Sequence, residues 1–297
     1  ELVSRHGNVD VSEVQGAAKL DVEHGELSVR RTGGLDVGIQ YGGLTVAGVA
    51  GDLAVRGGHA ELRASDVTGR AELDTSFGGI HLARVGGEVR ATAQHGQVDA
   101  EDVAGNVFAE TTHAGVSLER VDGEVQGIVD HGGIEARSLS KGAKLRATGG
   151  DVSLDGFTGP VEVEVERGSA RLSPRAPVLS AITATVTNGA VRLDVPEGSR
   201  FDLDAEAQRG ETQAQVPGLD VQAVMDHRGK GGQAHVFGVE LEQDVMHGRI
   251  AAEHQVLHIL GGEPQVLPAF LGHFHLLEGP VLLFLFFLRG PSLPDRF

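Results

Sequence analysis

One short pattern recurs every 18 residues through the first part of the chain. Each repeat opens on a turn dipeptide, usually a ring-bearing residue followed by glycine or alanine, and successive dipeptides are 18 residues apart except for one step of 17. A fixed period of this length indicates a repeat architecture. The dipeptides begin at His6, His24, Tyr41, His59, Phe77, His95, His113, His131, Gly149 and Arg167.

Between the turns, apolar residues occupy fixed positions that favour strands. Within each run they are two residues apart and are largely β-branched, which is typical of a strand with one buried face and not of a helix. A second glycine about ten residues after each turn separates the two runs. The repeat that begins at His95 shows the inward positions as Val98, Ala100, Val103, Val107, Ala109 and Thr111.

Stacking of the repeats follows from the shortness of these strands. A strand of about five residues cannot bury its apolar face alone, so neighbouring repeats must cover one another. We therefore predict an all-β fold, a single-stranded β-helix or β-solenoid with coils of about 18 residues and two short strands per coil. The turn glycines are expected to supply positive φ angles. Opposite charges should meet on the outer wall, as at Glu119, Arg137 and Asp155, or at Lys144 and Glu162.

The regular period does not extend to the end of the sequence. It lengthens to 21 residues at Asn188 and Arg209 and is lost from about residue 237. We predict a solenoid domain over residues 1–236 and an atypical tail over 237–297. The last part, from Met246 to Phe297, is rich in Leu, Phe and Pro. Three interpretations stay open for it: a C-terminal cap, a poorly ordered tail, or sequence not native to the fold, such as a shifted reading frame.

Composition excludes several classes of function. With 42 acidic and 25 basic residues the net charge is −17, which argues against a nucleic-acid partner because phosphates are held by Lys and Arg. The chain has no cysteine, so thiol catalysis and cysteine-based metal sites are absent. The longest apolar run, Val281 to Leu288, is far too short to span a membrane. We expect no cofactor.

The ring-bearing turn residues are the strongest candidate for a functional site in the sequence. In a solenoid they would stand on adjacent coils about 4.8 Å apart. We expect flat rings to stack there, because Tyr41 and Phe77 share the position and are not useful zinc ligands. His95, His113 and His131 are the three consecutive histidines that could grip a metal ion, and they are the metal candidate of this sequence.

Motifs for catalysis are missing. The acidic groups are spread along outward strand positions and do not converge on a groove, as at Asp99, Glu101 and Asp102, or at Glu162, Glu164 and Glu166. Phosphate-binding glycine loops and a nucleophile elbow are also absent from the sequence. These observations predict that the protein is not an enzyme.

The repeat blocks resemble a known family. His24 to Val29, His95 to Ala100 and Asn188 to Leu193 are similar to the (His/Asn)-Gly-x-Val-x-Val rungs of the bacterial adhesin-like β-strand repeat family, a domain family of unknown function. The resemblance covers roughly residues 1–235. It implies a β-helix fold and an extracytoplasmic or cell-envelope location, and it supplies no catalytic residue.

The sequence therefore predicts a non-enzymatic structural or adhesin-like interaction module of the cell envelope, with a protein or glycan ligand that remains unknown. Three alternatives stay open. They are a carbohydrate-active β-helix enzyme, a self-assembling scaffold that resembles bactofilin filaments, and a metal-sequestering column of histidines. The oligomeric state is left open.

Overall fold

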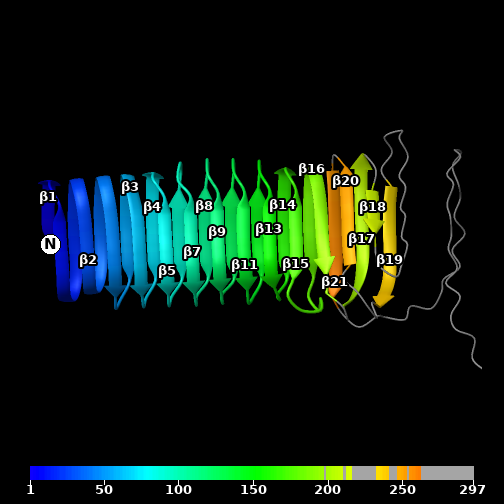
Figure 1. Ribbon diagram of the computed structural model, residues 1–297, viewed down its shortest axis with the longest axis horizontal. Coiled ribbons are helices and arrows are strands. Elements are labelled where there is room, and N and C mark those ends of the chain that lie inside the picture. Colours follow the sequence, from blue (N-terminus) through cyan, green and yellow to red (C-terminus); the bar gives the residue numbers. More distant parts are fainter. Residues whose placement is uncertain (197–198, 210–211, 216–231, 241–245, 253, 262–297) are drawn as a thin grey trace, which may run out of the picture. The chain divides into compact units, whose positions relative to one another are not determined.

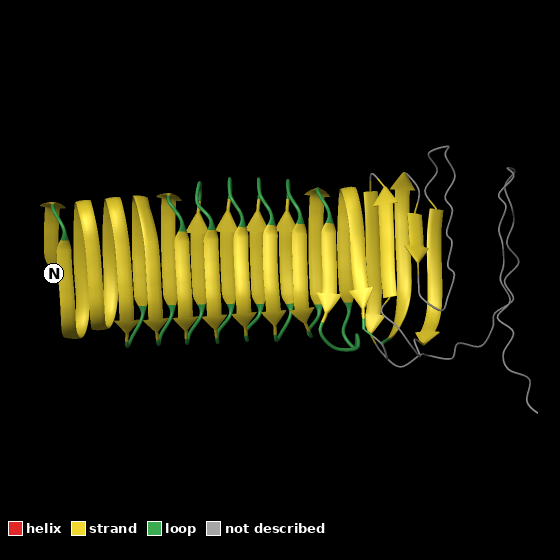
Figure 2. Cartoon of the chain, in the orientation of Figure 1, coloured by secondary structure: helices red, strands yellow, loops and turns green. Residues whose placement is uncertain are grey.

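The computed structural model describes residues 1–196, 199–209, 212–215, 232–240, 246–252 and 254–261. Every regular element in these residues is a β-strand, and Figure 2 shows no helix among them. The predicted all-β solenoid with coils of about 18 residues is confirmed. The chain divides into two compact units, Glu1–Pro264 and Gln265–Phe297. The second unit lies outside the described residues.

The strands are short in the central coils and run on around the turns in the first ones (Figure 1). Their bounds are β1 (Leu2–His6), β2 (Val9–Val49), β3 (Leu53–Val67), β4 (Ala71–Phe77), β5 (Ile80–Val85), β6 (Val89–Ala93), β7 (Val98–Val103), β8 (Val107–Thr111), β9 (Val116–Val121), β10 (Val125–Val129), β11 (Ile134–Leu139), β12 (Ala143–Ala147), β13 (Val152–Phe157), β14 (Val161–Arg167), β15 (Ala170–Pro174), β16 (Ile182–Val195), β17 (Arg200–Arg209), β18 (Thr212–Gln215), β19 (Gly232–Glu240), β20 (Met246–Ala252) and β21 (His254–Gly261).

Each central coil contributes one strand to each of two parallel stacks. Strands β5, β7, β9, β11 and β13 pair in sequence, and β4, β6, β8, β10, β12 and β14 pair in a second series. The register is one full repeat, so Val98 pairs with Val116 and Val107 with Val125. Every residue therefore lies beside the residue of the same repeat position in the next coil.

The core consists of the inward columns that the sequence pattern predicts. In the coil that begins at His95, Val98, Ala100, Val107 and Ala109 are each at most 2% exposed. The same columns are filled by Val, Leu, Ile and Ala in the neighbouring coils. Burial of these continuous columns is the main stabilising contribution, since no strand has a buried face without its neighbours.

One corner of the coil has a conformation that the sequence analysis did not predict. Two consecutive residues face outward there, such as Glu101 and Asp102 between the buried Ala100 and Val103. The second of the two has a positive φ in every coil from the first to the ninth. Seven of these nine residues are not glycine, and the column consists of Glu13, Arg31, Gly48, Asp66, Arg84, Asp102, Arg120, Ser138 and Gly156.

The expected assignment of positive φ to the turn glycines is therefore only partly correct. Gly25 and Gly78, which follow the ring-bearing residues, do have positive φ. The second glycine of the repeat does not, and its role is close approach. A Cβ atom on Gly123 would lie 2.2 Å from the carbonyl oxygen of Gly105 in the preceding coil. Only glycine lets the two backbones stack at this turn.

The parallel stack ends at β16, where the pairing becomes antiparallel. β16 pairs with β20 through Val191 and Ile250, and with β21 through Ala184 and Leu257. β17 in turn pairs antiparallel with β19 and β21. Strand β19 contains residue 237, where the sequence analysis places the boundary between the solenoid domain and the tail. That boundary stays a prediction. Residues 262–297 of the predicted tail lie outside the described residues.

Replacing Thr32 with Val is expected to stabilise the fold. Thr32 is 4% exposed, and its hydroxyl has no hydrogen-bond partner among the described residues. The same column holds Val49, Val67 and Val85 in the next coils. Removing a buried, unpaired hydroxyl should add about 1 kcal/mol to the free energy of unfolding, measured by denaturant titration.

Thr111→Val is the matched control for this change. Thr111 is equally buried, but its hydroxyl donates a hydrogen bond to the Gly96 carbonyl at 3.0 Å. This variant should be neutral or destabilised, since it loses that bond. Stabilisation of both variants by the same amount would mean that the hydroxyl at position 32 is not the cause.

Candidate functional site

The ring-bearing residues form one continuous stack along a turn of the solenoid. The seven consecutive pairs from His6 to His131 have ring centroids 4.5–5.4 Å apart and planes within 18° of parallel. The predicted stacking is confirmed. All eight side chains are exposed, Tyr41 by 46% and Phe77 by 42%. Because each face is covered by the next ring, the stack presents mainly ring edges to a partner.

The three metal candidates lie at one end of this stack. His95 and His113 have centroids 4.6 Å apart with planes at 2°, and His113 and His131 are 5.4 Å apart at 8°. Imidazole lone pairs lie in the ring plane, so nearly parallel rings direct them side by side and not toward one ion. Within the described part of the chain, no group of three or more His, Asp or Glu side chains is arranged to hold a metal.

Replacing Phe77 with Ala tests the contribution of the stack to stability. Phe77 lies between His59 and His95 with both centroids at 4.5 Å. We expect the free energy of unfolding to fall by about 1 kcal/mol, because two stacked contacts are lost. Leu179→Ala is the control, since Leu179 is 77% exposed and its truncation should have little effect. Equal effects of the two changes would contradict a stabilising stack.

A second ladder runs along the corner of positive φ, and it is made of charges. Arg84 donates hydrogen bonds to both carboxylate oxygens of Asp66, at 2.6 and 2.9 Å. Arg120 in the same way contacts Asp102, and it also pairs with Glu101 and Glu119. These residues alternate in sign from coil to coil. The ladder therefore links adjacent coils on the outside of the solenoid, in water-exposed positions where each pair contributes little by itself.

The arginines of this ladder lower the pKa values of its carboxylates. The hydrogen bond from Arg84 lowers the pKa of Asp66, and the hydrogen bond from Arg120 lowers the pKa of Asp102. The same contacts raise the pKa of both guanidinium groups. Four groups are thus held in their charged forms for a structural reason, and their perturbed pKa values are those of an ion-pair ladder and not of a catalytic centre.

The double variant Asp66→Asn/Asp102→Asn should lose less stability in acid than the wild type. A lowered folded-state pKa contributes stability that is complete above the unfolded-state value of about 3.9 and disappears as the pH falls through the folded-state value. We expect the wild-type Tm to fall more steeply than that of the variant between about pH 5 and about pH 2.5, followed by circular dichroism. Asp155→Asn serves as the control on the same outer wall. Parallel curves for wild type and double variant would show that the ladder contributes nothing.

One further cluster spans three coils on the outer wall. His81 lies between two carboxylates, with Nε2 2.9 Å from Glu61 Oε1 and Nδ1 2.8 Å from Asp99 Oδ2. Gly79 leaves the space that the ring occupies, since a Cβ there would lie 3.2 Å from His81 Nε2. Carboxylate oxygens only accept hydrogen bonds, so both contacts are hydrogen bonds only when the ring carries both protons. The cluster joins coils and leaves neither imidazole nitrogen free.

Sequence reasoning missed this cluster because Glu61 and His81 are 20 residues apart and occupy different repeat positions. It could have been found by laying the coils in register and noting that Gly79 separates Glu61 from Gln97 in one column. Asp99 is one of the outward acidic groups of the sequence analysis and belongs to this cluster, whereas Glu162 and Glu164 lie apart from it. Glu162 pairs with Lys144 at 2.9 Å, as predicted, and Glu164 lies 3.6 Å from Arg146.

No family model, curated protein or solved structure matches this chain. The solenoid architecture is therefore established by the structure itself. None of the described residues forms a helix with the length and apolar character that crossing a bilayer requires.

Proposed function

We propose that this chain is a non-enzymatic structural or adhesin-like interaction module of a bacterial cell envelope. In this role the solenoid is a stiff element that holds a regular, charged surface in place for a protein or glycan ligand. Catalysis is not part of the proposal.

The observation that carries the proposal is the use of exterior side chains to join adjacent coils. In an ordinary globular surface, charged and aromatic residues project into water with few specific partners. Here the ring stack, the Asp66–Arg84 and Asp102–Arg120 pairs and the Glu61–His81–Asp99 cluster all connect one coil to another. Side chains held in this way suit a stiff spacer or a fixed docking surface.

The cell-envelope location is supported by the resemblance of the repeated rungs to the bacterial adhesin-like repeat family. It is also consistent with the acidic composition, which keeps a protein soluble at high local density. Fractionation of the bacterium that encodes this chain, with an antibody raised against it, tests the location. We expect the signal in the envelope fraction, and a signal confined to the cytosol would contradict the proposal.

Two assays on the full chain separate this proposal from its alternatives. Light scattering coupled to size-exclusion chromatography should give a particle that does not grow into filaments as concentration rises. Incubation with acidic polysaccharides should release no new reducing ends. Filaments would favour a self-assembling scaffold, although the antiparallel pairing of β16 with β20 and β21 interrupts the parallel stack there. Released sugars would favour a carbohydrate-active enzyme.

A further inference from the structure

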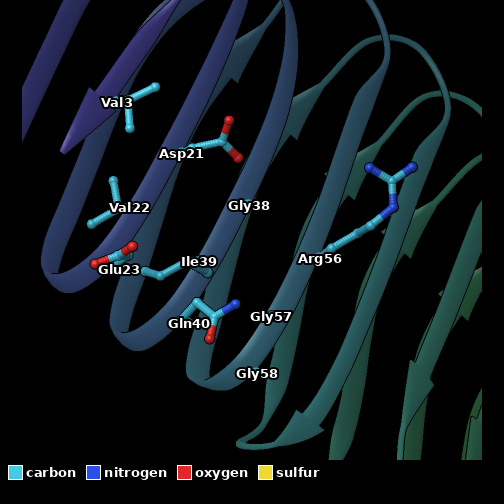
Figure 3. Close-up of a pocket in the computed structure, with 10 residues that line it drawn as sticks. All are labelled: Val3, Asp21, Val22, Glu23, Gly38, Ile39, Gln40, Arg56, Gly57 and Gly58. Atoms are coloured by element: carbon cyan, nitrogen blue, oxygen red, sulfur yellow. The ribbon is translucent and has the colours of Figure 1, made fainter. Parts of the chain in front are cut away.

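A hollow of about 400 Å³ interrupts the outer wall of the first coils. This volume falls in the range of small-molecule sites, about 300–1,000 Å³. Its polar lining consists of Asp21, Glu23, Gln40 and Arg56, and Gly38 and Gly57 lie between them. Figure 3 shows Asp21 and Glu23 on one coil, Gln40 on the next and Arg56 on the one after, with the bare backbone of Gly38 between Asp21 and Arg56.

The hollow exists because one outward column lacks a side chain. Gly38 pairs in register with Arg56, and Val3 pairs with Asp21 in the same column. The Asp21 carboxylate lies over Gly38, where a Cβ atom would come within 2.5 Å of Asp21 Oδ1. The backbones of Asp21 and Arg56 are therefore two coil spacings apart, about 10 Å, with Gly38 between them.

The donor and acceptor groups around the hollow favour a neutral, hydroxyl-rich ligand. The Asp21 and Glu23 carboxylates only accept hydrogen bonds, the Arg56 guanidinium only donates them, and the Gln40 amide does both. Arg56 is also held by Asp36 at 3.4 Å. A cation would be attracted by the two carboxylates but repelled by the guanidinium. An anion would be repelled by the two carboxylates. Hydroxyl groups both donate and accept hydrogen bonds, so they are compatible with all four side chains.

The edge of the hollow also offers an apolar contact. Val3 is 67% exposed and borders the hollow beside Asp21. A pyranose ring has both features that this arrangement would recognise, polar hydroxyls around its rim and C–H groups on its face. The small apolar area predicts weak binding to a single site, with specificity carried by the polar groups.

We propose that this hollow is a binding subsite for a neutral sugar unit of a glycan. The inference rests on the proposed function, which it deepens by naming the class of ligand and the residues that hold it. Asp21, Glu23, Gln40 and Arg56 bind the hydroxyls, and Gly38 provides the space.

Saturation-transfer difference NMR on the full chain tests the subsite with three neutral probes: maltotriose, cellotriose and N-acetylchitotriose. At least one is expected to bind, and Gly38→Gln should weaken that binding at least tenfold. The variant should fold, because only the mobile end of the Asp21 side chain stands in the way of a new Cβ. Thr92→Gln is the matched control, since Thr92 lies in the same column three coils later, in a part of the wall outside the hollow. Melting curves of both variants confirm folding.

Three results would overturn the subsite. They are no saturation transfer to any of the three sugars, binding that Gly38→Gln leaves unchanged, and transfer only to a cationic probe such as lysine amide. The last result would make the hollow a cation site. The fractionation experiment measures location independently, so failure of the subsite and failure of the proposed function can be told apart.

Discussion

Backbone pairing between coils at a single repeat of register is the constraint on which the rest of this structure depends. Parallel strands stack about 4.8 Å apart, and the period of about 18 residues places each residue beside the residue of the same repeat position in the next coil. Inside, this arrangement fills continuous columns such as Val49, Val67, Val85 and Val103. At the ring-bearing turn it places side chains directly beside one another, which favours flat rings, and at the second turn the backbones approach so closely that glycine is needed.

The inward half of the fold could be predicted from the sequence because alternation and period are properties of the chain alone. The positions of Val98, Ala100 and Val107 follow from spacing, and so does the parallel register. The corner of positive φ could not be predicted in this way, since seven of its nine residues, Asp102 and Arg120 among them, are not glycine. The signal was present in the gap of three between inward residues such as Ala100 and Val103, which leaves two outward residues to turn the chain.

Outer-wall chemistry was predictable only in part, because it depends on rotamers as well as register. Lys144 pairs with Glu162, as adjacent positions predict. Arg137 lies in register with both Glu119 and Asp155, yet it forms its ion pair with Glu135 of its own strand. His81 and the Gly38 hollow both depend on a glycine in an outer column, where a missing side chain redirects its neighbours or leaves a space. Binding sites in this protein are therefore expected at outward positions where glycine replaces a residue with a side chain.

Disulfide formation between engineered cysteines tests the one-repeat register most directly. The chain contains no cysteine, so His95→Cys/His113→Cys introduces a single pair one coil apart, within the Cα separation of about 4.4–6.8 Å that a disulfide requires. His95→Cys/His131→Cys places the pair two coils apart, about 10 Å. The account predicts rapid intramolecular cross-linking of the first variant under mild oxidation and none in the second. Cross-linking of both variants, or of the second alone, would contradict the stacked register.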